Sequence, residues 1–540
     1  MLDFIFGLKS KTITISAAIL GVSSTISALL GIVRDRLLAG TFGAGVQLDV
    51  YFAAFRIPNL VYGILITGGL VAAFLPVFSE TFEDNEEEGW ELVSNLLNFL
   101  LLALSGLSFL LFLFAPWVVR LIAPGFNAAQ TEWTIILTRI MMVSPILLGV
   151  SSMLSGVLKY FDHFITYALA PILYNLGIIF GIIFLVPIFD LLGLAYGVVL
   201  GALAHMIIQI PAAKKIGFEY RPILDLSSKK LRRIARLIVP RMVGQASTQI
   251  NMVVITAIAS TLTAGSLSIF NFADHLQAFP VRVIGVSFAV AAFPRFSKNL
   301  ANGEKIKFLD NFSNSARKIL FAIIPISFLT FILRGQVVRL VLGTGRFDWT
   351  DTRLTAASLG IFAFSLFANA LSHLFIRAFF AMQDTKTPVY ISIGGVVVNV
   401  LLAVGFVFLL QNPGPVRAGL VYFLRLESLQ SIEVLAFPLA FFFSMSAQII
   451  ALYIILKKKV GDLRGVEIFD SAVRILGSSI VMTIAAFFTL RIMVSFIELD
   501  TFLAVFAQAA VTTIVGVIVY LLAAHVFDSP ELKSIVKKLL

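Results

Sequence analysis

Long uninterrupted apolar segments are the feature that most limits what this chain can fold into. A helix needs about 20 mostly apolar residues to cross a bilayer, and the sequence holds roughly fourteen segments of that length. Of its 540 residues, 59% are apolar and only 13% are charged, which is typical of a polytopic membrane protein and not of a soluble one. We predict an all-α fold with about fourteen transmembrane helices, centred within residues 12–42, 49–78, 92–118, 132–157, 164–187, 191–212, 234–260, 267–296, 313–333, 353–381, 387–410, 434–456, 470–493 and 500–526.

The distribution of basic residues predicts the orientation. Lysine and arginine collect in loops on one side of the expected helices, for example at Lys9, Lys214 and Lys457, and few lie on the other side. Because cytoplasmic loops carry an excess of Lys and Arg, we expect an even number of helices with both termini in the cytoplasm. The acidic loop at 80–91 breaks the pattern, but acidic residues contribute little to orientation.

A weak internal repeat predicts two related halves. The segment from Phe52 to Ser79 recurs from Phe272 to Ser297, at an offset of roughly 218–220 residues. Both copies are the second helix of a six-helix block and end on the same side, which indicates parallel repeats. We expect two pseudo-symmetric six-helix lobes around a central cavity, with two further helices appended. The predicted parts are a lobe at 1–213, a basic connector at 214–233, a lobe at 234–460 and the appended pair at 461–540.

The basic connector has two interpretations that the sequence leaves open. It could be a hinge-like link whose lysines and arginines also meet anionic lipid headgroups. It could equally be a plain cytoplasmic anchor of the kind that sets membrane orientation.

Charges inside the first apolar helices predict a site. Arg34, Asp35, Asp49 and Arg56 stand in otherwise apolar sequence. Bare charge at membrane depth costs a few kcal/mol or more, so such residues face a partner or a watery cavity. Adjacent residues on a helix point about 100° apart, so we expect Arg34 to face the cavity while Asp35 pairs elsewhere. The pattern favours a partly cationic cavity for an anionic or amphiphilic ligand; the alternative is structural ion pairs and interfacial arginines.

Further candidates are polar residues inside other apolar helices. Three of them are assigned to the same cavity, with a structural ion pair or an interfacial position as the alternative: Arg139, Asp274 and His275. Two asparagines could bind a coupling cation or form interhelical hydrogen bonds: Asn251 and Asn399.

The sequence lacks the motifs that are typical of several function classes. There is no phosphate-binding Gly-Lys-Ser/Thr loop, no HExxH and no nucleophile elbow, so we do not expect an enzyme. There are no cysteines and only five scattered histidines, so we expect neither a metal site nor a bound cofactor. The net charge of +11 is not interleaved with base-stacking aromatics, so we expect no nucleic acid partner. Energy for transport would come from a Na⁺ or H⁺ gradient or from the membrane potential.

Five segments resemble one known family, the MurJ/MviN lipid II flippases of the MOP exporter superfamily. They are LGIVRDRLLAGTFGAGVQLDVYFAAFRIPNL (30–60), LIAPGF (121–126), LTRIMMVSPILLG (137–149), FADHLQAFP (272–280) and FFAMQDTKTPV (379–389). The resemblance implies a flippase in the bacterial cytoplasmic membrane. It would carry the undecaprenyl-pyrophosphate-linked peptidoglycan precursor from the inner to the outer leaflet. It also implies two lobes around a cationic cavity, with the last two helices forming an apolar groove for the lipid tail.

The chain keeps some of the family's basic positions and lacks others. Arg34 and Arg56 match positions that the resemblance assigns to pyrophosphate binding. His275 stands where the family usually has arginine, and Ala28 and Tyr62-Gly63 replace further arginines. Arg282, about two helical turns after His275, is a candidate to compensate for that arginine; the alternative is an ordinary packing position. Two alternatives stay open: a cation-coupled exporter of drugs, solutes or other lipid-linked oligosaccharides from the same superfamily, and a membrane scaffold for cell-wall enzymes. The expected partners are a lipid-linked saccharide and cell-wall synthesis enzymes.

Overall fold

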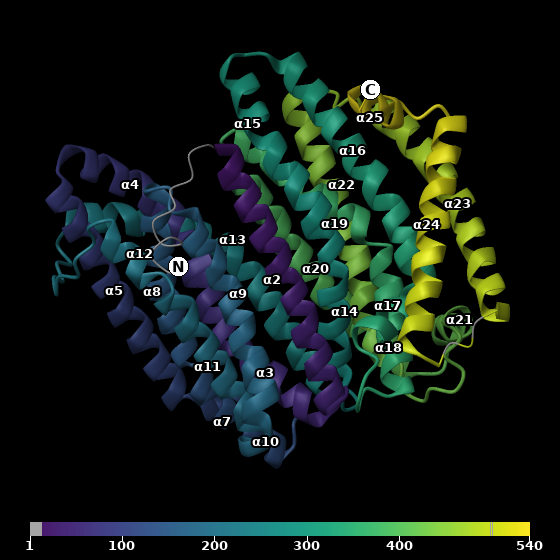
Figure 1. The fold of residues 1–540 in the computed structure, drawn as a ribbon, viewed down its shortest axis with the longest axis horizontal. Coiled ribbons are helices and arrows are strands. Elements are labelled where there is room, and N and C mark those ends of the chain that lie inside the picture. Colours follow the sequence, from purple (N-terminus) through teal and green to yellow (C-terminus); the bar gives the residue numbers. More distant parts are fainter. Residues whose placement is uncertain (1–12, 68, 497, 499, 540) are drawn as a thin grey trace. The chain divides into compact units, whose positions relative to one another are not determined.

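The computed structural model describes residues 13–67, 69–496, 498 and 500–539, and every regular element among them is a helix (Figure 1). They separate into two compact units, Met1–Ser268 and Ile269–Leu540. The first unit contains α2 (Ile13–Phe42), α3 (Val46–Tyr62), η1 (Gly63–Thr67), α4 (Leu70–Asp84), α5 (Glu86–Leu113), α6 (Ala115–Ile122), α7 (Ala128–Met141), α8 (Val143–Tyr160), α9 (Phe164–Phe180), η2 (Gly181–Leu185), α10 (Val186–Phe189), α11 (Leu191–Ile207), α12 (Ile210–Lys215) and α13 (Lys229–Ser260).

The second unit begins inside α14, whose first residues belong to the first unit. Its elements are α14 (Ser266–Pro280), η3 (Val281–Val286), α15 (Ser287–Ala301), α16 (Lys305–Ile332), α17 (Arg334–Val341), α18 (Trp349–Ala363), α19 (Leu366–Ala381), α20 (Lys386–Gln411), α21 (Pro415–Leu424), η4 (Glu433–Leu435), α22 (Ala436–Val460), α23 (Gly465–Phe496), α24 (Phe502–Val526) and α25 (Pro530–Leu539). The division into lobes, connector and appended helices expected from the sequence stays a prediction.

The predicted all-α membrane fold is confirmed. Among the described residues, eleven helical stretches are long and apolar enough to cross a membrane, or thirteen if each of two bent pairs is one span. The bent pairs are Lys229–Val239 with Gly244–Ser260, at 52°, and Trp349–Ala363 with Leu366–Ala381, at 48°. Each of these spans coincides with one apolar segment of the sequence, and the remaining expected segment, 12–42, coincides with the 30-residue helix α2.

Glycines bring α9 and α11 of the first unit into close contact. A Cβ on Gly177 would lie 2.2 Å from the Cα of Gly201, and one on Gly181 would lie 2.6 Å from the Cα of Gly197. Small residues of this kind allow helix backbones in membranes to approach and pack. Because α9 also packs against α2, this contact holds α2 in place.

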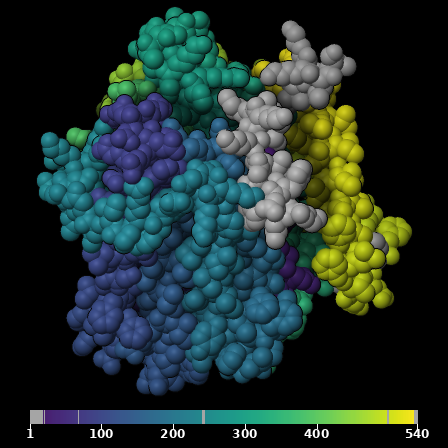
Figure 2. All heavy atoms as spheres, turned by 60° about the vertical axis from the view of Figure 1, so that its left-hand side comes forward, coloured from purple at the N-terminus to yellow at the C-terminus, as the bar shows by residue number. Residues whose placement is uncertain are grey.

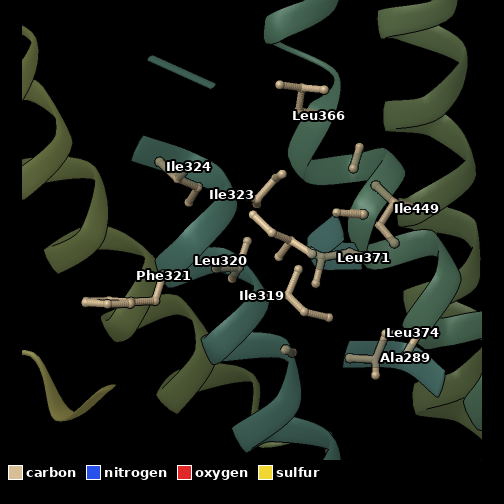
Figure 3. Packing of buried hydrophobic residues seen from close by; sticks show 14 of the residues in the cluster. Ala289, Ile319, Leu320, Phe321, Ile323, Ile324, Leu366, Leu371, Leu374 and Ile449 are labelled. Atoms are coloured by element: carbon tan, nitrogen blue, oxygen red, sulfur yellow. The ribbon is translucent and has the colours of Figure 1, made fainter. Parts of the chain in front are cut away.

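The second unit is packed around α16. Isoleucine and leucine side chains of α16, such as Ile319 and Ile323, interdigitate with Leu371 and Leu374 of α19 (Figure 3). The pair α23 and α24 also packs on α16. The buried hydroxyl of Tyr520 donates a hydrogen bond of 2.8 Å to the carbonyl of Phe321, which satisfies a polar group that would be costly to bury unpaired.

The repeat detected in the sequence shares an unusual backbone feature. The stretch α3–η1–α4 is interrupted by the π-helix Gly63–Thr67, and the stretch α14–η3–α15 by the π-helix Val281–Val286. The two π-helices are separated by the same offset as the repeat. Short π-helical segments are rare in proteins, and those that occur are often found at functional sites. Their matching positions support descent of the two stretches from one repeat.

The acidic loop and the basic connector pair with each other. Arg221 contacts Glu87 and Glu91 at 3.1 and 3.2 Å. Arg233 contacts Glu80 at 2.7 Å, and Figure 2 shows the two segments side by side on the surface of the first unit. The acidic residues at 80–91 therefore neutralise part of the connector.

Side-chain amides of α5 fix the connector backbone as well. Asn95 accepts from the N–H of Asp225 and donates to its carbonyl, at 2.8 and 3.0 Å. Asn98 donates to the carbonyls of Arg221 and Ile223. The Ser227 hydroxyl and N–H donate to the Asp225 carboxylate and lower its pKa. These bonds hold the connector against α5, which favours an anchor over a free hinge.

Candidate functional site

Arg34 forms an ion pair with its own neighbour. Its Nε and Nη2 donate to Oδ1 of Asp35 at 3.1 and 2.8 Å, and its side chain is 21% exposed. The sequence predicts different partners for Arg34 and Asp35, but the structure pairs them with each other. The Cβ atoms of adjacent residues diverge, but the arginine side chain is long enough to fold back to the neighbouring carboxylate.

Asn175 joins Arg34 to a second helix. Its Oδ1 accepts from Arg34 Nη1 at 3.3 Å, and its Nδ2 contacts the carbonyl and hydroxyl of Ser27, both at 3.2 Å. The buried amide thus connects α9 with α2 and holds the guanidinium. Sequence reasoning missed Asn175, although a lone asparagine within the apolar segment 164–187 was a usable signal.

The guanidinium of Arg34 keeps capacity to bind an anion. Arginine has five N–H donors, and three of them make the hydrogen bonds to Asp35 and Asn175. The other two make no hydrogen bond to any residue that the structure describes. Tyr51 and Tyr174 are close enough to interact electrostatically with Arg34. Partly buried donors held by a neighbouring helix are suited to a charge-assisted contact with phosphate.

Arg56 lies on α3 and contacts α13. Its Nε donates to the Oγ1 of Thr256 at 2.8 Å, and that hydroxyl donates in turn to the carbonyl of Met252. Gly63, the residue directly after α3, lies so close to Gln249 that a Cβ would be 2.5 Å from its Nε2. Thr256 could not be predicted as a partner from the sequence, because threonine in a helix often bonds its own backbone.

Asp49 is buried and binds the start of α14. Its Oδ2 accepts from the N–H of Gly265 at 2.7 Å, and its Oδ1 accepts from the N–H and hydroxyl of Ser268 at 2.8 and 2.6 Å. A carboxylate is stabilising at a helix N-terminus, where backbone N–H groups lack partners within the helix. The structure thus gives Asp49 a capping contact with α14.

Two glycines allow the turn between α13 and α14 to pack closely against other backbone segments of the first unit. Gly265 has φ of +90°, and a Cβ there would lie 2.1 Å from the carbonyl oxygen of Ala44. A Cβ on Gly125 would lie 2.2 Å from the carbonyl oxygen of Ser260. The turn therefore closes on segments 43–45 and 123–126 at backbone contact distance.

Replacing Asp49 with alanine should loosen this turn. Three donors would lose their acceptor, and each buried unsatisfied group costs about 1–3 kcal/mol. We expect a lower melting temperature and faster amide exchange at Gly265 and Ser268, measured by hydrogen exchange with mass spectrometry. Ser268→Ala is the matched control, because it removes one hydroxyl and leaves both backbone bonds. Equal exchange in wild type and Asp49→Ala would contradict the capping role.

The contacts of Arg139 involve neither Arg34 nor Arg56. Its Nε donates to the carbonyl of Phe112 at 3.1 Å, and its guanidinium lies 5.0 Å from the centre of that ring. It lines a cavity of about 720 Å³ together with Arg120 and Glu132. No contact among the described residues joins Arg139 to the other predicted site residues.

The remaining candidates are dispersed. Asp274 is half-buried and accepts from the side-chain amide of Gln277 at 3.0 Å. His275 and Asn251 are half-buried, Arg282 is exposed within η3, and Asn399 is buried in α20. No group of three or more histidine, aspartate or glutamate residues that could hold a metal occurs in the described part of the chain. The assignment of all these residues to one ligand site stays a prediction.

Comparison with known proteins decides the family. The family model described as "Lipid II flippase MurJ" matches residues 38–529. The chain belongs to the MurJ family. A "Probable lipid II flippase MurJ" of Buchnera aphidicola subsp. Acyrthosiphon pisum is 31% identical over 400 residues, covering 72% of this chain and 77% of that relative. A "Lipid II flippase MurJ" of Burkholderia cenocepacia is 28% identical over 408 residues, covering 74% and 79%.

Solved structures confirm the MurJ fold. A structure of "Lipid II flippase MurJ, inward closed conformation" superposes with a TM-score of 0.76 at 21% identity, covering 94% of this chain and 98% of that one. An inward-facing multidrug resistance MATE transporter of the MOP superfamily gives a TM-score of 0.68 at 15% identity, covering 83% and 99%. Its family and its long apolar helices together indicate that this MurJ homologue is a multi-pass protein of the bacterial inner membrane.

Proposed function

We propose that this chain moves lipid II from the inner to the outer leaflet of the membrane for cell-wall synthesis. Membership in the MurJ family is the observation that carries the proposal. Arg34 supports it, because the guanidinium is held by Asp35 and Asn175 and still has two N–H groups to offer. The chain would act as a transporter and not as a catalyst.

Arg34 and Arg56 would hold the pyrophosphate during transfer. An anionic headgroup cannot cross hydrocarbon unaided, because its desolvation costs far more than thermal energy. Charge-assisted hydrogen bonds contribute about 1.5–3 kcal/mol each and would offset part of that cost. The lipid tail would stay in the bilayer or along an apolar groove formed by residues 461–540. Alternating access would expose the headgroup to one side at a time.

The energy source and surroundings are part of the same proposal. No bound cofactor is required, and a Na⁺ or H⁺ gradient or the membrane potential would drive transfer. Each elementary charge that crosses the membrane gains about 2.3 kcal/mol per 100 mV. Both termini would lie in the cytoplasm, as the loop charges indicate. Enzymes that make and use the precursor would be the protein partners.

A depletion experiment tests the function directly. Cells that lose their native flippase and express this chain should keep growing and should present lipid II on the outer leaflet. The measurement is the fraction of precursor accessible to an externally added enzyme that cleaves the lipid-linked saccharide. Normal membrane expression without outer-leaflet precursor would refute lipid II transport. An energised vesicle assay with cationic drugs would then test the exporter alternative.

A further inference from the structure

A cavity in the first unit is lined by Arg139 but by none of Arg34, Asp49 and Arg56. It has a volume of about 720 Å³ and runs along the hairpin formed by α6 and α7. Its ionisable lining residues are Arg120, Glu132 and Arg139; most of the others are apolar, such as Pro116 and Ile135. The lining therefore carries a net positive charge in apolar surroundings.

The two arginines present free donors to this cavity. Arg139 is oriented through its Nε, which donates to the Phe112 carbonyl, and through the face of the Phe112 ring. Its terminal nitrogens make no hydrogen bond to a described residue. Arg120 is exposed and has neither a hydrogen bond nor an ion pair with any part of the chain that the structure describes. An anion entering the cavity would meet both guanidinium groups.

The α6–α7 hairpin has exposed aromatic and apolar side chains of the kind found at a membrane interface. Trp117 is 65% exposed, Leu121 is 76% exposed and Trp133 is 39% exposed. Tryptophans of this kind are enriched where helices leave the hydrocarbon for the headgroup region. Arg139 lies eleven residues after the start of α7, which places it about 16 Å further along the helix axis. The cavity thus extends from the interface towards the depth of the acyl chains.

We propose that the cavity between α6 and α7 binds the headgroup phosphate of an anionic phospholipid from the extracellular leaflet. On the orientation proposed above, the hairpin faces that leaflet. Basic pockets between transmembrane helices are suited to anionic headgroups. A lipid fits better than a soluble anion, because the exposed apolar rim would contact its acyl chains while the arginines bind its phosphate. The Glu132 carboxylate repels the lipid phosphate and so lowers the affinity of the cavity for the lipid. It favours lipids whose phosphate binds away from that carboxylate.

Lipid at this site would bear on the contact between segment 123–126 and the end of α13. The cavity wall includes Ala123, Pro124 and Phe126, which flank Gly125. Gly125 donates through its N–H to the Ser260 hydroxyl at 3.1 Å and touches the end of α13. A bound lipid would therefore stabilise the wall that supports this contact.

Titration of the purified full chain with phospholipid tests the proposal. Delipidated protein in detergent is titrated with phosphatidylglycerol and, separately, with phosphatidylcholine, and bound lipid is counted by native mass spectrometry. We expect phosphatidylglycerol to bind wild type selectively, and the Arg120→Gln/Arg139→Gln variant to bind about ten-fold or more weakly, since each arginine supplies a charge-assisted bond. Glu132→Gln should bind more tightly. Arg346→Gln removes an exposed arginine outside the cavity and should leave binding unchanged.

Several results would overturn the site. Equal binding of phosphatidylglycerol by wild type and the double variant would place the lipid elsewhere. Displacement by inorganic phosphate would show a site for soluble anions, and preference for undecaprenyl pyrophosphate would show a site for the transported substrate. If the double variant fails to fold, the exposed single changes Arg120→Gln and Glu132→Gln must still shift affinity in opposite directions, or the proposal fails. Outer-leaflet lipid II measured in Arg120→Gln separates this proposal from lipid II transport itself.

Discussion

Replacing Arg34 with alanine should abolish lipid II transport while leaving the protein folded. The side chain is only 21% exposed and pairs with the buried Asp35, so its removal should cost some stability, and the amount of folded protein has to be measured beside activity. The lost contact with pyrophosphate is charge-assisted and worth about 1.5–3 kcal/mol, which lowers affinity roughly ten-fold to more than a hundred-fold. The measurement is growth after depletion of the native flippase, with the amount of variant in the membrane determined in parallel.

Three matched changes separate charge from geometry at this site. Arg34→Lys keeps the charge but loses the planar fork that binds phosphate through two N–H groups, so it should restore little activity. Asn175→Ala removes the bond to α9 and should give a smaller defect, because Asp35 still holds the guanidinium. Arg346→Ala, at an exposed position, should have no effect. Full growth with normally expressed Arg34→Ala would remove Arg34 from the transport mechanism.

The helices could be predicted from the sequence because length and hydrophobicity alone decide them. An apolar segment such as 387–410 has one stable arrangement in a bilayer, a helix that satisfies its own backbone hydrogen bonds, and the structure places α20 there. The repeat was visible too, because the second helices of both halves keep similar residues. The two π-helices within the repeat could not be predicted from the sequence, because their residues share no distinctive composition.

The contacts of the candidate site depended on information that the sequence pattern does not hold. Asp49 reaches Ser268, a partner more than two hundred residues away in the chain. Arg34 meets Asp35 only through a particular side-chain conformation that helix periodicity does not fix. Charge in the sequence therefore selected candidate residues in the first helices, but the partner of each charge came from tertiary structure.

A disulfide between segments 43–45 and 261–265 should stop transport reversibly. These segments meet where Gly265 approaches the Ala44 carbonyl, at backbone contact distance. Gly43 has φ of +69° and Gly265 has φ of +90°, conformations that favour glycine, so the cysteines belong at Ala44 and Ala264. In alternating access this end must open to release the headgroup, and a disulfide between the two segments would prevent it. The chain has no cysteine of its own, so the pair reacts in a clean background.

The expected result is loss of outer-leaflet lipid II under oxidation and recovery with reducing agent. Each single cysteine should transport normally in both conditions. A second pair, Asn95→Cys with Asp225→Cys, tests whether any crosslink is harmful, because the short Asn95 side chain already bonds the backbone N–H and carbonyl of Asp225 at 2.8 and 3.0 Å. That link should be tolerated, since α5 lies in the predicted lobe 1–213 and the connector follows that lobe directly, whereas Ala44 and Ala264 lie in the two different predicted lobes. If the Ala44–Ala264 disulfide forms completely and transport continues, release does not require this end to open, and alternating access through it is wrong.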